Sequence, residues 1–397
     1  MAAAGPARAI EISQLLAFDV GPLTLRPSAS VSEMYDDNVF FLPSSVPREG
    51  DFITTFSAGL NISLGKEVAS NPWLDVSEKE VNFASLDYQL DSPFYARYSE
   101  LNALNHSLSF RNRWKGNRFT IKGSDSVQSI TSLLGGGYGV QYNVSRMVYR
   151  DDYRVEYKLT DKTQVYLNGA HAASDYEQDT PLYDSDTLKG TVGFEFRALP
   201  KTSFFGEVYY GQSAVGTNRA FDTKGPHEEF TGGFVGTRGT FTPHLFGVIK
   251  AGFEQPSFSD GTPVSGSPVV DASLTHRYRE RTSTTLSYSR QTGVSVQAAG
   301  VSYSSEVFRL GFNQRLGDTG RLTASLTGSA EYDDYGSSGF YSNRQDTWYR
   351  LSANFTYLIR LWMSASAGYE FEKFASTGQG IIDYDVNRVT LKLAIGY

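Results

Sequence analysis

The stretch NRVTLKLAIGY, Asn387 to Tyr397, ends the chain with strict alternation of apolar and polar side chains. In an extended chain, alternate residues point to opposite faces, so its aliphatic side chains share one face of a strand. The remaining sequence has no surplus apolar segment that could cover this face as a core. We therefore expect the face to meet lipid, in the strand that closes a bacterial outer-membrane barrel against its first strand.

The composition agrees with an all-β membrane protein. The 397 residues include 38 Gly, 25 Tyr and 26 Phe but no Cys, a usage that suits strands joined by turns. No run approaches the roughly 20 apolar residues that a membrane-spanning helix requires, which excludes a helical membrane protein. Strands can cross lipid only as a closed barrel, because every backbone donor and acceptor must find a partner without water.

The alternating pattern predicts a single domain of eighteen strands, and an even number lets the first and last strands pair antiparallel. The strands are expected at residues 23–35, 52–64, 82–98, 103–114, 118–127, 143–159, 163–174, 185–198, 202–213, 228–241, 245–255, 267–279, 282–292, 300–316, 320–333, 346–358, 362–374 and 384–397. Segments 82–98 and 228–241 alternate poorly, so sixteen strands is the alternative. Residues 1–22 are expected to be a periplasmic lead and 23–397 the barrel. Residues 1–9 lack the apolar core of a secretory signal, so we expect a mature chain with an added start Met.

The connections fall into two classes that alternate along the chain. Short ones carry turn residues, as in Lys115-Gly116-Asn117, and the longer ones are polar or rich in Gly. This asymmetry predicts an antiparallel up-and-down barrel with short periplasmic turns and long extracellular loops. The connection 65–81 is long on the short-turn side, where we expect a periplasmic contact. Aromatic residues near strand ends, including Tyr157 and Trp348, predict belts at the membrane interfaces.

One short motif carries a family resemblance. Residues Ser32 to Phe41 read SEMYDDNVFF, and a second strand then opens with Asp51-Phe52-Ile53. This arrangement resembles the outer-membrane family called putative β-barrel porin type 2, although the chain ends in Tyr rather than the commoner Phe. The resemblance implies a β-barrel associated with exopolysaccharide synthesis and export.

The strand parity also predicts which charged side chains face the lumen. The basic residues expected to line it and set its selectivity are Arg26, Arg111, Arg113, Lys122, Arg150, Arg154, Lys189, Arg197, Lys250, Arg277, Arg309, Arg315, Arg350, Arg388 and Lys392. Because the whole chain has a net charge of −7, the acidic excess must lie in loops and turns. A basic lumen would favour anionic solutes. The alternative is that these charges pair across strands and fill a plugged interior.

The sequence gives little support for a metal site or a catalytic site. The acidic doublets Asp36-Asp37, Asp151-Asp152 and Asp333-Asp334 lack the twelve-residue calcium pattern, and the five histidines have no metal-ligand spacing. His106 and His171 point outward by parity, without an identifiable partner that would make either a catalytic base. We therefore expect no enzyme, no metal, no cofactor and no nucleic-acid partner. The glycines 135–137 are expected in a flexible or inward-folding loop rather than a phosphate-binding one.

These patterns predict an integral outer-membrane channel for polar, anionic solutes, with an exopolysaccharide export pore as its specific form. The alternative is an anchoring barrel with a plugged lumen that binds a periplasmic or surface partner. Expected partners are outer-membrane lipid and lipopolysaccharide, the barrel-assembly machinery through the last strand ending at Tyr397, and periplasmic polysaccharide-export components.

Overall fold

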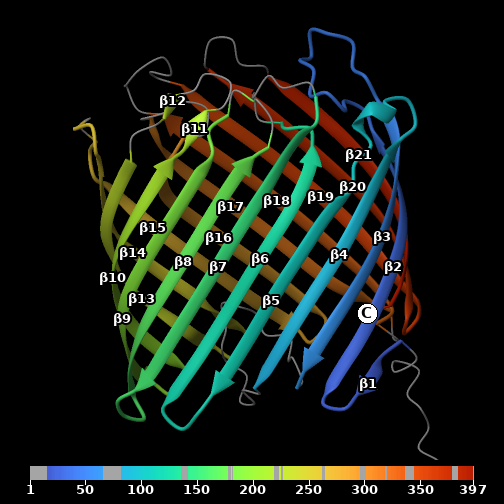
Figure 1. Cartoon of the computed structure of the whole chain (residues 1–397). Helices are drawn as coiled ribbons and strands as arrows, with labels where there is room; N and C mark the ends of the chain where they lie inside the picture. Colours follow the sequence, from blue (N-terminus) through green and yellow to red (C-terminus); the bar gives the residue numbers. More distant parts are fainter. Residues whose placement is uncertain are drawn as a thin grey trace, which may run out of the picture.

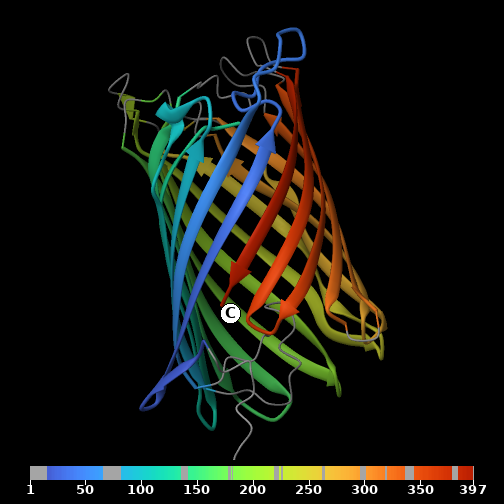
Figure 2. The same ribbon diagram turned by 90° about the vertical axis from the view of Figure 1, so that its right-hand side faces the viewer.

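The computed structural model describes residues 16–65, 82–135, 142–177, 180, 182–218, 223–224, 227–261, 264–295, 301–317, 320–335, 344–377 and 383–396. Eighteen long antiparallel strands form one closed sheet (Figures 1 and 2). They are β2 (Leu23–Asp36), β3 (Asp51–Leu64), β4 (Phe83–Tyr95), β5 (Asn105–Lys115), β6 (Phe119–Ser132), β7 (Val144–Lys158), β8 (Thr163–Tyr176), β9 (Ser185–Leu199), β10 (Thr202–Val215), β13 (His227–Thr242), β14 (Leu245–Phe258), β15 (Ser267–Arg279), β16 (Thr282–Val294), β17 (Ser302–Leu316), β18 (Leu322–Tyr335), β19 (Gln345–Arg360), β20 (Met363–Ser376) and β21 (Tyr384–Ile395).

Closure occurs between β2 and β21, as the carboxy-terminal alternation predicts. Their register runs from Ala29 opposite Ile395 to Asp36 opposite Arg388, eight residue pairs in all. Strand β2 extends beyond the end of β21, and a short strand β1 (Phe18–Val20) pairs with its first three residues. This hairpin covers part of an edge that would otherwise expose backbone groups.

The predicted count of eighteen strands is confirmed, and the two poorly alternating segments are the barrel strands β4 and β13. Some boundaries differ from the prediction. Strand β6 continues to Ser132, so the loop expected from residue 128 is shorter. The connection after β4 contains a 3-10 turn, Ser99–Leu101, and the β10–β13 connection contains the small ladder β11 (Thr217–Asn218) with β12 (Thr223–Lys224); neither was predicted. Of the expected contact segment 65–81, residues 66–81 lie outside the described residues, as does Tyr397.

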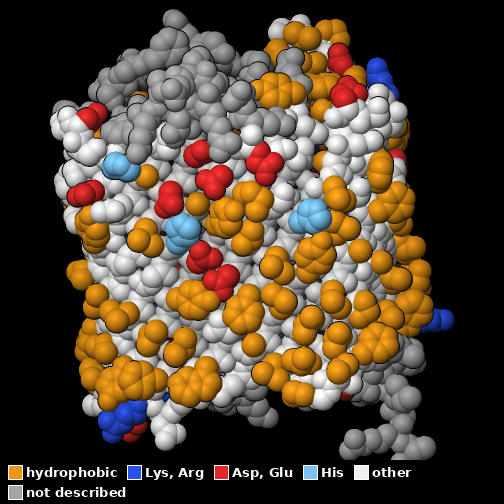
Figure 3. All heavy atoms as spheres, in the orientation of Figure 1, with side chains coloured by type: hydrophobic (Ala, Val, Ile, Leu, Met, Phe, Trp, Pro, Cys, Tyr) orange, Lys and Arg blue, Asp and Glu red, His pale blue; other side chains and the backbone are white. Residues whose placement is uncertain are grey.

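The two faces of the sheet differ as the alternation requires. Outward side chains form a broad apolar band around the lower part of the barrel (Figure 3), with Val235 72% and Leu391 61% exposed. In water such a surface would be unfavourable, whereas lipid accommodates it. The two rims also differ: short turns join strands at one end, here called the short-turn rim, and longer connections form the opposite, long-loop rim (Figure 1). No helix in the described part of the chain has the length and apolar character needed to cross a membrane.

The aromatic belt is present in part. Phe119 and Tyr157 contact each other at the short-turn end, with ring centroids 4.7 Å apart. Trp348 contradicts the prediction, because its register places it on the inward face, with its ring 4.7 Å from that of Phe374. Proximity to a strand end therefore did not distinguish the two faces.

Apolar side chains gather inside the long-loop rim. Phe374, Tyr384 and Val386 form a buried cluster against which Phe41 and Trp348 pack. Gly135, three residues beyond β6, also lies here, since a Cβ on it would come within 2.6 Å of the Tyr384 hydroxyl and 3.1 Å of the Phe41 ring. Strands β6 and β21 are five ladder steps apart, roughly 24 Å along the wall, so the described start of this connection reaches inward over the mouth. For Gly135 this agrees with an inward-folding loop; residues 136 and 137 lie outside the described residues.

Candidate functional site

The candidate site is the inward wall of the barrel. The pairing registers place fourteen of the fifteen predicted basic residues on the parity opposite to the apolar band. Arg197 follows the last paired residue, Phe196, and continues the same parity on β9. Their role in selectivity stays a prediction. The structure adds what each side chain contacts, and that divides the wall into two regions.

On the region formed by β6 to β15, several of the basic side chains are paired with carboxylates. Arg154 Nε and Lys122 Nζ lie 2.7 and 3.3 Å from Glu156 Oε1. Arg238 donates a charge-assisted hydrogen bond to Glu195. Such pairs hold side chains against the wall and cancel the field that a solute would meet.

Arg238 was not among the predicted lumen residues. It lies on β13, whose inward parity carries Phe230 and Phe234 while glycine and threonine occupy much of the outward parity. Along part of this strand, apolar side chains therefore lie on the inward face and small or polar ones on the outward face. This explains its poor alternation. In the sequence, Arg238 and Glu228 both have even numbers, so they fall on the same face of the strand; this was the only signal for an inward Arg238.

A second group on this region mixes acids, lysines and tyrosines. Glu207 accepts a hydrogen bond of 2.7 Å from the Tyr166 hydroxyl, and Lys250 Nζ lies 3.5 Å from Asp271 and 3.8 Å from Glu207. Lys189 Nζ lies 3.7 Å from the centroid of the Tyr209 ring. These contacts satisfy the charges locally, as the alternative of charges that pair across strands expects for this region.

The region formed by β15 to β18 is different. Arg309 is flanked in the register by Ser287 and Ser329, and Arg315 lies six residues further along the same inward face. Arg277 lies over the Phe246 ring, 4.7 Å from its centroid. Within the described residues, none of these three guanidinium groups forms an ion pair with a carboxylate. A strip of uncompensated positive charge therefore runs along this side of the lumen.

At the edges of this strip, basic side chains again pair with carboxylates. Arg350 Nη1 lies 3.1 Å from Glu331 and its Nε 3.8 Å from Glu372. Of the other predicted residues, Arg111 pairs with Asp87 at 3.1 Å, while Arg26 donates hydrogen bonds to Asn61 and Ser63. The remaining inward positions are Arg113, Arg150, Arg197 and Lys392.

The motif of the family resemblance fastens the seam between β2 and β21. Arg388 Nε lies 2.8 Å from Asp36 Oδ2. Asp37 accepts hydrogen bonds from the backbone and side-chain nitrogens of Asn387, at 2.7 and 2.8 Å. Arg48 then bridges Asp37 and Asp385, at 2.6 and 2.5 Å. The first acidic doublet is thus an ion-pair partner at the seam.

Asn38 completes this arrangement. Its amide nitrogen donates to the carbonyl oxygens of Leu42 and Asp385, and its side-chain oxygen accepts from the backbone nitrogen of Leu42. Burial alone would raise the pKa of Asp37, but the hydrogen bonds from Asn387 and the pairing with Arg48 outweigh it and lower that pKa. The loop 37–50, here called the seam loop, is tied to β21 by these contacts.

His106 and His171 lie on the outward parity, as predicted, but both have partners. His171 Nδ1 is 2.9 Å from Asp151 and its Nε2 3.5 Å from Asp186. His106 Nδ1 is 2.9 Å from the Tyr88 hydroxyl. Because both nitrogens of His171 face carboxylates, neither is aimed at a hydroxyl nucleophile, as a catalytic base requires. No group of three or more metal-ligating side chains occurs in the described ranges.

A family model matches the second half of the barrel. The model described as "Putative beta-barrel porin 2" matches residues 200–397. Over these residues the chain belongs to that porin family. The resemblance read from the first two strands is therefore confirmed in the other half of the barrel. No curated protein matches the chain significantly.

Solved structures of similar fold have very different sequences. Pseudomonas aeruginosa OpdO is 12% identical, with 94% of this chain and 97% of that chain covered and a TM-score of 0.48. Acinetobacter baumannii OccAB4 is 10% identical, with 94% and 98% covered and a TM-score of 0.46. A BenF-like porin from Pseudomonas fluorescens is 8% identical, with 94% and 99% covered and a TM-score of 0.43. The porin family and the closed barrel imply an outer-membrane location and a channel rather than an enzyme.

Proposed function

We propose that this porin conducts polar anionic solutes along its lumen. The observation that carries the proposal is the strip of Arg277, Arg309 and Arg315, whose guanidinium groups have no carboxylate partner among the described residues. Positive charge lining a narrow passage with low-dielectric walls raises the local concentration of anions and sets selectivity. A barrel of eighteen strands is wide enough for an aqueous lumen.

A narrower form of the proposal is export of an acidic exopolysaccharide. It rests on the seam motif Tyr35 to Asn38 and on what the family resemblance implies. The extended, repeating carboxylates of such a polymer would suit a strip of guanidinium groups that follows one wall. In this proposal the short-turn rim faces the periplasm, where export components would deliver the polymer, and β21 is the segment that the assembly machinery recognises. The outward face would meet lipid and lipopolysaccharide.

Single-channel recording in a planar bilayer tests the conduction proposal, with the anion-to-cation permeability ratio taken from the reversal potential in a salt gradient. We expect an anion-preferring conductance, and Arg309→Glu should lower or reverse that preference. Lys373→Glu is the matched control, because its register places the same charge change on the outward face of β20. Equal effects of both variants, or a cation-preferring wild type, would contradict the proposed role of the strip.

A second candidate is a barrel closed at its long-loop end, which anchors or displays a partner. The packing of Gly135 against Phe41 and Tyr384 favours it, because that contact extends cover over the mouth. Negligible current at moderate voltage would support this candidate over free diffusion. The Phe41→Ala variant distinguishes a removable cover, which would then conduct, from a filled lumen, which would not.

A further inference from the structure

The outward apolar band differs in height between parts of the barrel. Two hairpins can be matched, β6–β7 and β18–β19, because a long connection joins each at the long-loop rim and both end at the short-turn rim. At the short-turn end Phe119 lies opposite Tyr157 in the first hairpin, and Leu322 lies opposite Tyr357 in the second. We call these two pairs the reference rows. Outward residues counted from them toward the long-loop rim are compared at equal distances along the strands.

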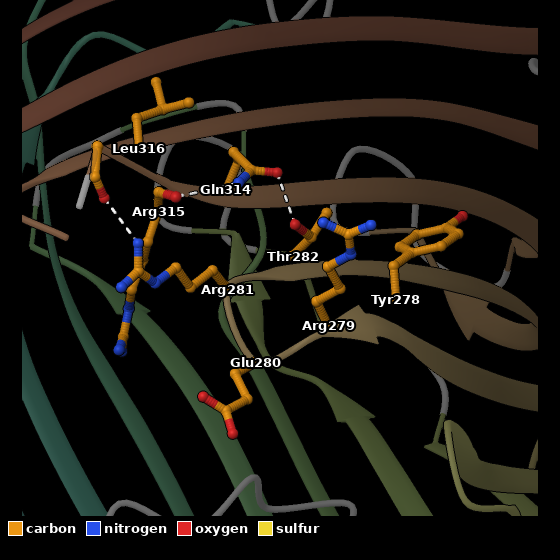
Figure 4. Close-up of a pocket in the computed structure, with 9 residues that line it drawn as sticks. Tyr278, Arg279, Glu280, Arg281, Thr282, Gln314, Arg315 and Leu316 are labelled. Atoms are coloured by element: carbon orange, nitrogen blue, oxygen red, sulfur yellow. Dashed lines mark hydrogen bonds between the residues drawn. The ribbon is translucent and has the colours of Figure 1, made fainter.

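The reference rows lie at the short-turn boundary of the band. At the β15–β16 turn this boundary consists of the outward residue Tyr278, 56% exposed, followed by the charged residues 279–281 (Figure 4). Tyr157 and Tyr357 likewise lie near the short-turn ends of β7 and β19. Aromatic rings favour the level of the lipid head groups, so the reference rows give the two hairpins a common starting height.

The first outward charges appear at different distances from these rows. Six residues above its reference row, β6–β7 carries the opposed pair Asp125 and Asp151, whereas β18–β19 carries Gly328 and Leu351 there. The first outward carboxylate of β18–β19 is Asp334, twelve residues above the row. Charge therefore enters the outward face of β6–β7 at half the distance.

The seam hairpin β2–β3 resembles β18–β19. Leu23 lies opposite Leu64 at its short-turn end. The outward residues above them are apolar as far as the pair Glu33 and Thr54, ten residues higher. Phe56, just below that pair, is 54% exposed. The long apolar stretch therefore occurs on two separate parts of the wall, and the short one on β6–β7.

Strand geometry converts these distances to heights. A strand rises about 3.4 Å per residue, and the strands of membrane barrels tilt by about 40°. The acidic pair of β6–β7 is then roughly 15 Å above its reference row, and Asp334 is roughly 30 Å above its own. The apolar band of such barrels is about 25 Å tall. Two hairpins thus present a full band, whereas on β6–β7 the charges lie about 10 Å inside it.

The charged row continues onto β8, where His171 lies beside Asp151 in the register. Figure 3 shows acidic and histidine side chains at mid-height on this face. Tyr153 donates a hydrogen bond of 2.5 Å to Asp125, and His171 Nδ1 lies 2.9 Å from Asp151. Each contact uses one carboxylate oxygen, and no described residue bonds the other. Hydrocarbon is a costly environment for such groups, whereas water and hydrated head groups satisfy them.

The charge of this face favours lipid head groups over a second barrel as its cover. Three carboxylates, those of Asp125, Asp151 and, one row higher on β9, Asp186, share the face with His171. Two copies that met through this face would oppose carboxylates with carboxylates, and like charges across an interface are unfavourable. Head groups bring water and counter-ions, which compensate the charge.

We propose that the bilayer is thinner along β6–β9 than along β18–β19 and β2–β3. Lipid head groups on the long-loop side then descend to Asp125, Asp151 and His171. A bilayer accommodates a short apolar stretch by local thinning, at a modest cost. The inference concerns the outer face alone and does not depend on conduction through the lumen.

Spin-label depth measurements test the proposal, and the absence of cysteine from the chain allows one label per variant. Val127 and Ala330 are outward positions eight residues above the two reference rows. A nitroxide on Val127→Cys or Ala330→Cys therefore starts from equal heights on the two faces. In dioleoylphosphatidylcholine vesicles, power saturation compares collisions with oxygen, which concentrates in hydrocarbon, and with a water-soluble nickel chelate. We expect nickel collisions to dominate at position 127 and oxygen collisions at position 330.

A second variant tests whether the charged row sets the boundary. Asp151→Leu, added to Val127→Cys, should at least halve the ratio of nickel to oxygen collisions, because it lengthens the apolar stretch. Asp152→Leu is the matched control, since it removes the same charge from the adjacent residue, whose register with Ser124 places it on the inward face. The control should leave the ratio unchanged.

Oxygen dominance at both labelled positions would overturn the proposal, and so would equal effects of the two leucine variants. Shielding of position 127 from both reagents, with spin–spin broadening between labels on two copies, would overturn it in favour of a contact between barrels. The comparison of positions 127 and 330 uses neither leucine variant, so it decides the question even if Asp151→Leu does not fold.

Discussion

At the scale of single residues, aromatic rings on the wall depend on glycines opposite them. Tyr166 pairs with Gly193 in the β8–β9 register, and a Cβ on that glycine would lie 2.1 Å from the ring. The ring is also held by the guanidinium carbon of Arg154, 3.6 Å from its centroid, and by its hydrogen bond to Glu207. The glycine is therefore required for this network to form.

We predict that Gly193→Ala destabilises the barrel by about 1–3 kcal/mol, because the added methyl must displace a packed ring. Gly190→Ala on the same strand should have little effect, since a Cβ on that glycine would meet nothing within 4 Å. Urea unfolding in lipid vesicles, followed by tryptophan fluorescence, measures both. Equal destabilisation would show that strand-forming preference rather than the ring contact decides the cost.

The face of the strand on which each residue lies was predictable from the sequence, but its ion-pair and hydrogen-bond partners were not. Each basic residue falls on a face according to its odd or even position, so Arg309 and Arg154 could both be assigned to the lumen. Whether a carboxylate lies beside each depends on the register between strands, which single-strand alternation does not contain. The ion pair of Lys122 with Glu156, between β6 and β7, and the serine neighbours of Arg309 therefore emerge only from the structure.

At the scale of elements, the seam is the shortest pairing among the barrel strands, with eight residue pairs against nine between β4 and β5. The seam loop adds contacts where the ladder is short. This explains physically why the acidic and amide side chains of Tyr35 to Asn38 occur together at the end of the first strand. The sequence presented them as a family motif, and their bonds to β21, some 350 positions away, required the fold.

Those contacts should depend on pH. The pKa of Asp37 is lowered from its ordinary value of 3.8, so its contribution to stability is present above that value and is lost as pH falls through the lower pKa of the folded state. Asp37→Asn should lower the unfolding temperature at pH 6, and the difference from wild type should shrink below pH 3.8. Glu100→Gln, an exposed change in the neighbouring loop, is the control. A difference that stays constant with pH would contradict the assigned charge.

At the scale of the whole molecule, hydrophobic alternation and turn residues predicted the strand number and the order of the connections. They succeeded because nearly every strand obeys one rule, apolar outward and polar inward, under the same lipid constraint. The rule fails near the long-loop rim. Trp348 and Tyr384 turn inward there to pack beneath the loops. They belong to a local core, and a rule that places apolar side chains against lipid does not predict such a core.

The closed ladder also makes a prediction for the molecule as a conducting unit. Ser30 and Ala394 are opposed across the seam, so Ser30→Cys with Ala394→Cys should form a disulfide in a chain that otherwise has no cysteine. We expect the oxidised form to unfold at a higher temperature than the reduced form, because the bond constrains a very long loop of the unfolded chain.

The conductance of the oxidised double-cysteine variant should match that of its reduced form and of each single-cysteine variant. Solute passes along the lumen, so the seam between β2 and β21 need not open. If oxidation abolished the current and reductant restored it, the path would run through an opening between β2 and β21. The seam loop would then be a latch on that opening, and the bonds of Asp37 and Arg48 would regulate conduction rather than only stabilise the barrel.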